Sequence, residues 1–250
     1  MKHGLVFVNN VPYDTPEATK ALLERIAFIR ETHYGGFYDF KPDLALADTA
    51  YTNLALPAHT DTTYFTEPAG LQSFHLLSHE AAPGEGAGPQ GGQSLLVDGF
   101  EAARRLREHD QGFYDTLAGV NIPWHASGNE GITIGPYKKF PVLEQGAGGR
   151  VLHRVRWNND DRGVVPVDLS NQWYEAARKW DELLKSPDLQ YWFQMVPGQV
   201  LSESCFSGVA VVPSRGKPRP ADDVLSFRQL AGAPRPERLH GDQEDLRRLQ

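Results

Sequence analysis

The fold prediction rests on the stretch Leu56-Pro57-Ala58-His59-Thr60-Asp61-Thr62-Thr63-Tyr64-Phe65. Residues two apart on a strand project from the same face, so we expect His59 and Asp61 to point the same way. One imidazole and one carboxylate can then hold a single cation, as two members of the 2-His-1-carboxylate facial triad that binds non-haem Fe(II). An isolated His-x-Asp pattern also arises by chance, and His59 is then a half-buried strand histidine. The surrounding sequence decides between the two interpretations.

Five blocks around this motif are distinctive. They are Ile29-Arg30-Glu31-Thr32-His33-Tyr34-Gly35-Gly36-Phe37-Tyr38, Asp48-Thr49-Ala50-Tyr51-Thr52, His59-Thr60-Asp61-Thr62-Thr63-Tyr64, Ser94-Leu95-Leu96-Val97-Asp98-Gly99 and Asn158-Asn159-Asp160-Asp161-Arg162. In this order they resemble the trimethyllysine dioxygenases of carnitine biosynthesis and, less closely, the γ-butyrobetaine dioxygenases. The resemblance covers Gly4 to about Leu201. It implies a mainly β fold with flanking helices, a double-stranded β-helix or jelly roll, which uses Fe(II), 2-oxoglutarate and O2, with ascorbate as reductant. The implied reaction is hydroxylation of Nε-trimethyllysine at C3.

Composition limits the class of protein. The chain has 250 residues, 40% of them hydrophobic and 23% charged, which is ordinary for a globular protein of one domain or two small ones. Its net charge of -7 argues against nucleic acid or an anionic membrane as the main partner. The single Cys205 excludes a disulfide framework, and no apolar run approaches the ~20 residues of a membrane span. The first residues lack signal-peptide or transit-peptide character. A cytoplasmic or mitochondrial location is expected. Its oligomeric state stays open, with a homodimer among the options.

Short β-type runs and a few amphipathic helices alternate along the chain. Strands are expected at residues 4–8, 70–77 and 93–98. Helices are expected at residues 15–30, 100–107 and 170–184. This mixture favours a β-sandwich or barrel with helices packed outside.

The resemblance assigns the metal and co-substrate site. His59 and Asp61 would ligate Fe(II), while 2-oxoglutarate chelates the metal through its keto oxygen and one carboxylate. Ser94 occupies the place where related oxygenases carry a hydroxyl that hydrogen-bonds 2-oxoglutarate; otherwise it is a solvent-facing strand serine. Tyr64 serves either packing or function.

The resemblance also assigns a substrate pocket. Tyr34, Tyr38 and Tyr51 match positions of an aromatic cage, in which ring faces attract the trimethylammonium group by ~0.5–2 kcal/mol per ring; otherwise they are core aromatics. Asp48 would meet the α-ammonium of trimethyllysine, or it is a turn residue. Asn159, with the neighbouring Asn158 and Arg162, would lie near the substrate carboxylate, although an Asn-Asn-Asp-Asp run is also a turn signal.

The C-terminal part departs from the family pattern. Pro197-Gly198-Gln199-Val200-Leu201 matches the segment that precedes the distal histidine ligand and the arginine for 2-oxoglutarate, but the expected continuation is absent. His240 resembles the missing ligand but lies too late in the sequence. Codons for Phe227–Pro236, read one base later, can spell Phe-Asp-Asn-Trp-Arg-Val-Leu-His-Gly, the family's continuation.

We therefore divide the chain into residues 1–201, a partial catalytic domain, and residues 202–250, a non-family tail. The tail is expected to be disordered, to derive from a retained intron and a frameshift, and to leave the β-helix incomplete. The start is likewise expected to lack the family's N-terminal domain. An impaired trimethyllysine dioxygenase is the leading interpretation. The alternatives are a γ-butyrobetaine-type hydroxylase and a non-catalytic remnant that binds quaternary ammonium compounds.

Overall fold

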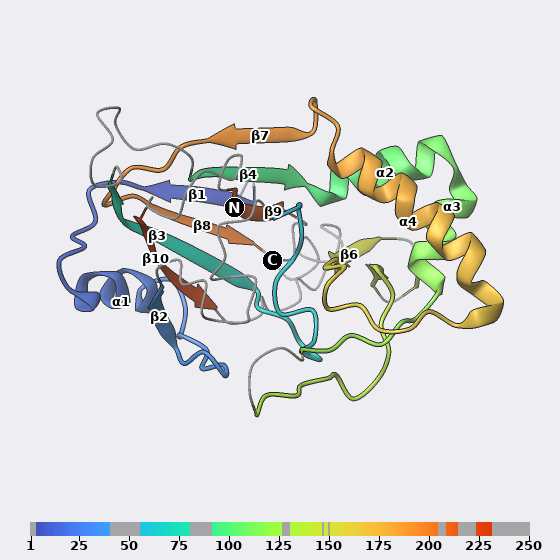
Figure 1. Cartoon of the computed structure of the whole chain (residues 1–250), viewed down its shortest axis with the longest axis horizontal. Helices are drawn as coiled ribbons and strands as arrows, with labels where there is room; N and C mark the ends of the chain where they lie inside the picture. Colours follow the sequence, from blue (N-terminus) through green and yellow to red (C-terminus); the bar gives the residue numbers. More distant parts are fainter. Residues whose placement is uncertain are drawn as a thin grey trace, which may run out of the picture.

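The computed structural model describes residues 4–40, 56–80, 92–126, 131–146, 148–149, 151–204, 209–214 and 224–231. The described strands pair antiparallel, in two larger sheets and one hairpin. In Figure 1 the larger sheets occupy one end of the molecule, and three helices pack together at the other. The predicted mixture of antiparallel strands and flanking helices is therefore confirmed.

The larger sheet has five strands. Their order is β1 (Leu5–Val8), β8 (Val200–Ser204), β3 (Leu71–Glu80), β10 (Val224–Ala231) and β2 (Phe37–Phe40). The second sheet has the order β7 (Gln190–Phe193), β4 (Gln93–Asp98) and β9 (Val209–Ser214). The hairpin consists of β5 (Leu143–Gln145) and β6 (Leu152–Val155).

The two larger sheets face one another across an apolar layer. Phe74 and Leu76 of β3 and Leu201 of β8 meet Leu96 of β4 in one buried cluster. Side chains alternate between the faces of a strand, so Gln72 shares the inner face of β3 with Phe74. A side chain that contacts the Gln72 side chain therefore lies at the interior of the sandwich.

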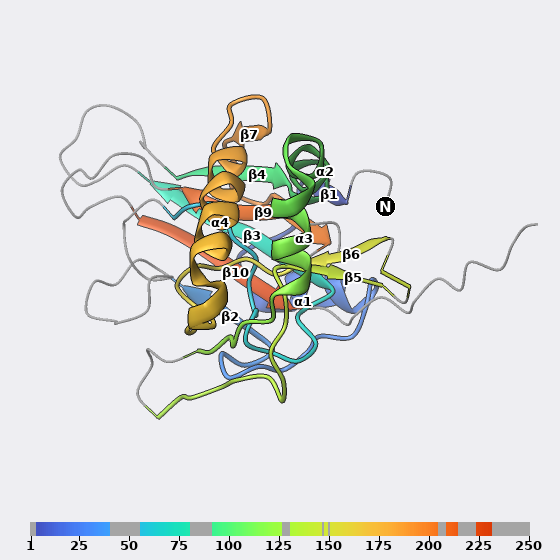
Figure 2. The same cartoon turned by 90° about the vertical axis from the view of Figure 1, so that its right-hand side faces the viewer.

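A second core lies between β4 and the helices. These are α2 (Gly99–His109), α3 (Gln111–Gly119), the short 3-10 helix η2 (Val167–Leu169) and α4 (Ser170–Leu184). Leu95 and Val97 join this core from the opposite face of β4, and Trp173 and Trp180 join it from α4. Figure 2 shows α3 and α4 in front of the sheets. The helices predicted at 100–107 and 170–184 are confirmed, whereas α3 was not anticipated.

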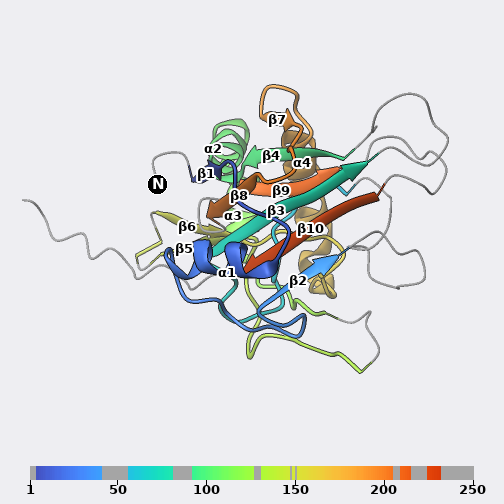
Figure 3. The same ribbon diagram turned by 90° about the vertical axis from the view of Figure 1, so that its left-hand side faces the viewer.

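The outer face of the five-stranded sheet carries α1 (Pro16–Glu24), which lies in front of β3 and β10 in Figure 3. Thr19 Oγ1 lies 2.8 Å from Nδ1 of the buried His75, which ties the helix to β3. The helix ends earlier than residue 30, because the backbone N–H groups of Ile26 and Ala27 both turn back to the carbonyl of Leu23. Within the described ranges, no helix has the length and apolar character needed to cross a membrane.

The expectation of irregular chain from Ser202 onward is wrong for three segments. Residues 202–204 continue β8, while β9 and β10 pair with β4 and β3. Strands β3 and β4 offer unpaired backbone groups at their edges, and the tail contains runs rich in Val, Leu and Phe, which suit strands. His240 lies outside the described residues, so its expected place is not tested.

Candidate metal centre and substrate pocket

The side chains of His59 and Asp61 converge, as predicted. Nε2 of His59 lies 3.3 Å from Oδ1 of Asp61, and Nδ1 of the same ring lies 2.8 Å from the carbonyl oxygen of Pro57. A protonated Nδ1 donates to that carbonyl, which leaves Nε2 directed at the carboxylate. Nε2 and Oδ1 are therefore placed to share one cation.

The two residues do not lie on a strand, and that part of the prediction is wrong. Residues 56–66 follow an irregular path, because Thr62 adopts a left-handed conformation with φ 57°. The segment is held at Trp157 instead. The N–H of Thr60 donates to the Trp157 carbonyl at 2.6 Å, and the N–H of Trp157 donates to Thr60 Oγ1 at 2.8 Å. A locally braced turn thus replaces the expected strand.

Asp61 is attached to the interior of the sandwich. Nε2 of Gln72 donates a hydrogen bond to Oδ2 of Asp61, and Gln72 lies on the inner face of β3. Glu203 of β8 stands directly opposite Gln72 in the sheet, only 1% exposed. The His59–Asp61 pair therefore lies against the inner face of the five-stranded sheet.

Electrostatics at this place favour a cation. Burial of the His59 ring works to lower its pKa, but the hydrogen bond and charge of Asp61 outweigh it and raise the pKa to about 9. Burial, opposed by a hydrogen bond from Thr63, raises the pKa of Asp161 to about 7, and burial also raises the pKa of Glu203 well above its ordinary value. Asp61 contributes to both shifts by charge repulsion. Such a concentration of carboxylates beside one imidazole suits a divalent metal ion.

Among the described residues, His59 and Asp61 are the two protein ligands found. In the parts of the chain that the structure describes, no group of three or more His, Cys, Asp and Glu side chains could hold a metal ion. His59 and Asp61 fit two positions of a facial triad, and the remaining positions would fall to other ligands.

Ser94 faces the same interior. It shares the inner face of β4 with Leu96, is 1% exposed, and its Oγ has no hydrogen-bond partner among the described residues. The interpretation as a solvent-facing serine is therefore wrong. A buried hydroxyl without a partner is available to a bound ligand.

Aromatic rings gather beside the turn that follows Asp61. The ring centroids of Tyr34 and His33 lie 3.9 Å apart, and those of His33 and Tyr64 lie 5.7 Å apart. The ring centroids of Tyr64 and Phe65 lie 5.0 Å apart, and Cζ of Arg30 lies 4.8 Å from the centroid of the Phe65 ring. Of these rings only Tyr34 was predicted for a cage. Tyr64, His33 and Phe65 lie in or next to the quoted blocks but could not be assigned without coordinates.

The structure does not describe the side chains of the other predicted cage residues or of Asp48. The backbone of Tyr38 belongs to β2, but its side chain is outside the description. Tyr51 and Asp48 lie outside the described residues. Their roles stay predictions.

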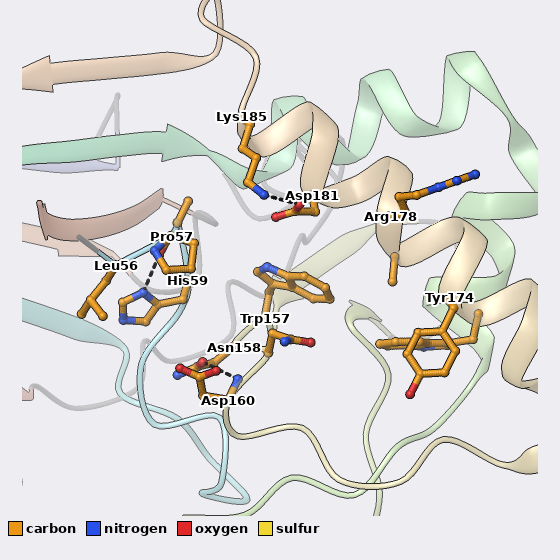
Figure 4. Close-up of a pocket in the computed structure, with 14 residues that line it drawn as sticks. Leu56, Pro57, His59, Trp157, Asn158, Asp160, Tyr174, Arg178, Asp181 and Lys185 are labelled. Carbon is orange, nitrogen blue, oxygen red and sulfur yellow. Dashed lines mark hydrogen bonds and ion pairs between the residues drawn. The ribbon is translucent and has the colours of Figure 1, made fainter. Parts of the chain in front are cut away.

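A pocket of about 450 Å³ opens beside His59 (Figure 4). One wall consists of Trp157, Asn158 and Asn159, and another of the α4 residues Trp173 and Tyr174. The predicted Asn159 is therefore brought to the same cavity as His59.

Arg162 fixes the arrangement of this wall. Its Nε donates to Oδ1 of Asn159 at 3.1 Å, its Nη1 donates to the hydroxyl of Tyr174 at 3.1 Å, and its guanidinium lies 5.3 Å over the Trp173 ring. Asn159 is held by a neighbour and not left as a mobile turn residue.

Comparison with family models gives a match over residues 1–202 to the taurine catabolism dioxygenase family, TauD/TfdA. The chain belongs to this family. The predicted resemblance is confirmed by relatives named trimethyllysine dioxygenase. The Neurospora crassa protein is 54% identical, with 82% of this chain and 52% of that protein covered. The mitochondrial human protein is 38% identical over 92% of this chain and 55% of its own length. The chain thus spans about half the length of the curated relatives it matches.

Solved structures of TauD-like oxygenases share the fold. An asparagine oxygenase in complex with Fe(II), 3-hydroxyasparagine and succinate superposes with a TM-score of 0.66 at 12% identity, covering 92% of this chain and 74% of that one. A taurine dioxygenase from Burkholderia xenovorans gives 0.61 at 14% identity, covering 92% and 77%. The predicted jelly-roll oxygenase fold is confirmed at this level.

Proposed function

We propose that this chain carries the catalytic core of an Fe(II)- and 2-oxoglutarate-dependent dioxygenase that hydroxylates Nε-trimethyllysine at C3. The observation that carries the proposal is the convergence of His59 Nε2 and Asp61 Oδ1, 3.3 Å apart, against the inside of the sandwich. The names of the relatives support the choice of substrate.

His59 and Asp61 would hold the metal, and Ser94 Oγ would donate to a carboxylate of 2-oxoglutarate. The hydroxyl of Ser94 is buried on the inner face of β4 and has no hydrogen-bond partner in the described part of the chain, which supports this role. Bound Fe(II) supplies the oxidising chemistry, at the expense of O2 and 2-oxoglutarate, with ascorbate as reductant.

Tyr34, Tyr38 and Tyr51 would enclose the trimethylammonium group, with Tyr64 as a further ring. The contact of Tyr34 with the His33–Tyr64 cluster supports an aromatic pocket in this region. Asp48 would receive the α-ammonium, and Asn159 would bind the substrate carboxylate from the pocket beside His59.

The family model matches residues 1–202, so residues 203–250 lie outside that match. We infer that the chain holds Fe(II) weakly, because the described residues present two protein ligands. In addition, the family's continuation, which carries the arginine that would pair bidentately with 2-oxoglutarate, does not follow Leu201 in the sequence. A protein that binds quaternary ammonium compounds without turnover is the alternative that this ligand count favours.

The human relative is named as mitochondrial, and we propose the same compartment for this chain. The partner is a small molecule, and a homodimer is the assembly we would test first. Neither nucleic acid nor a membrane surface suits the net charge of -7.

The test is product formation. The purified chain is incubated with excess Fe(II), 2-oxoglutarate, ascorbate and trimethyllysine, and C3-hydroxylated product and succinate are quantified by mass spectrometry. Product that disappears in His59→Ala and persists in His109→Ala, a change at the exposed end of α2, would support the proposal. Product formation that His59→Ala leaves unchanged would refute it.

A further inference from the structure

Arg156 is a buried arginine behind the turn that follows the metal pair. Its side chain is 0% exposed. Nη1 donates to the carbonyl oxygens of Thr63 and, at 2.8 Å, Phe65, while Nη2 donates to that of Thr66 at 3.3 Å. Nε donates to Oε1 of Glu144 at 2.7 Å. Most of the guanidinium fork is thus directed at one short stretch of backbone.

That stretch needs external support. Thr62 adopts φ 57°, a left-handed conformation that is strained for a β-branched residue. The N–H of Phe65 closes the turn on the Thr62 carbonyl at 3.0 Å, and the N–H of Ala69 donates to Thr62 Oγ1 at 3.0 Å. Arg156 donates hydrogen bonds to the carbonyl groups on the other side of the turn. It therefore fixes a conformation that the local sequence does not favour.

The turn joins two parts of the proposed site. Asp61 precedes it, held by Gln72. Tyr64 lies within it, and its buried ring contacts His33. The path of the turn therefore sets the distance between the metal pair and the aromatic cluster.

Stability alone does not account for an arginine here. A buried ion pair is often no more stabilising than apolar residues of similar volume. A lysine keeps the charge but lacks the planar guanidinium group. It therefore cannot donate hydrogen bonds to three carbonyl groups and to Glu144 in the same geometry.

We propose that Arg156 is a positioning residue that holds the Thr62–Thr66 turn, and thereby places the quaternary-ammonium pocket relative to the metal pair. This inference rests on the proposed function for the identity of the ligand. It assigns Arg156 a role in substrate affinity, although the residue has no contact with His59 or Asp61 among the described interactions.

The test compares Arg156→Lys with Glu144→Gln. Both disturb the same buried ion pair, but only Arg156→Lys removes the fork from the turn. Trimethyllysine affinity is measured by calorimetry with Mn²⁺ in place of Fe(II), and thermal stability is measured in parallel. We expect Arg156→Lys to weaken trimethyllysine binding about tenfold or more while Mn²⁺ affinity changes less than about threefold, and Glu144→Gln to leave both nearly unchanged. Equal loss of trimethyllysine affinity in both variants, or none in Arg156→Lys, would overturn the proposal.

Hydrogen exchange separates this inference from the proposed function. Without any ligand, the amides of Phe65 and Ala69 should exchange at least about tenfold faster in Arg156→Lys than in Glu144→Gln. If the unchanged protein binds no trimethyllysine, the substrate assignment fails, and the exchange rates still decide whether Arg156 holds the turn. Similar exchange in the two variants would refute the positioning role.

Discussion

Nε2 of His59 lies 3.3 Å from Oδ1 of Asp61, and the opposite ring nitrogen of His59 is held by the carbonyl of Pro57 at 2.8 Å. The backbone contact fixes both the ring orientation and the nitrogen that faces the carboxylate. Because the ring is mostly buried, its protonation is coupled to folding and to metal binding alike.

The metal-free protein should lose stability as the pH rises from 7 to 9. Burial lowers the pKa of His59, but Asp61 outweighs burial and raises it from 6.5 to about 9. The stabilisation is therefore complete below pH 6.5 and is lost as the pH rises through 9, by roughly 3 kcal/mol at most. Urea unfolding with a chelator present, at several pH values, measures the slope. His59→Gln should reduce the slope between pH 7 and 9 and leave only the part that the raised pKa values of Asp161 and Glu203 contribute. A slope of unchanged size in this variant would have another origin.

Gln72 should control metal affinity through Asp61. Gln72→Ala removes the hydrogen bond that orients the carboxylate, and losses of this kind typically lower metal affinity about 10- to 100-fold. Mn²⁺ titration followed by electron paramagnetic resonance gives the affinity. Ser73→Ala is the matched control, since Ser73 bonds Ser202 on the opposite face of the same strand. Equal effects of the two changes would argue against a specific role for Gln72.

Tyr64 should contribute to quaternary-ammonium binding. Tyr64→Leu keeps an apolar side chain but removes the ring face, so trimethyllysine affinity should fall about 5- to 30-fold. Calorimetry measures this, with Tyr137→Leu, at a side chain that is 76% exposed, as the control. Unchanged affinity in Tyr64→Leu would assign Tyr64 to packing.

The helical core should govern overall stability. Trp180 is 0% exposed and contacts Trp157, the residue that braces Thr60. Trp180→Ala should reduce the free energy of unfolding by about 3–5 kcal/mol. Urea denaturation measures this, and Tyr191→Ala, at an exposed position of β7, should cost less than about 1 kcal/mol. Similar losses at both positions would mean that the described core is not the stabilising one.

The sequence predicted those features that depend on local pattern. Helix α4 was predicted because Trp173, Ala177 and Trp180 recur at helical spacing, and these residues are buried as expected. Strand β4 was predicted because a run of apolar residues follows a Gly-rich turn. The convergence of His59 and Asp61 was predicted correctly, but from the wrong local structure.

Features that depend on long-range contacts were missed. The residues near Thr62 in the sequence do not predict a left-handed turn. The turn is stabilised by hydrogen bonds from Arg156, which is far away in the sequence. The pairing of β9 and β10 with β4 and β3 was likewise unforeseen, since the open strand edges that they occupy exist only in the folded sheet. The burial of Ser94 follows from the face of β4 on which it lies.

Binding of Fe(II) and 2-oxoglutarate tests the central claim most directly. Without oxygen, chelation of protein-bound Fe(II) by 2-oxoglutarate produces a visible charge-transfer absorption. With both in excess, to offset weak binding, the absorption should appear in the unchanged protein and in His109→Ala, and should be lost in His59→Ala and Asp61→Ala. An absorption that persists in His59→Ala and Asp61→Ala, or one that never appears in the unchanged protein, would contradict the assignment of this metal centre.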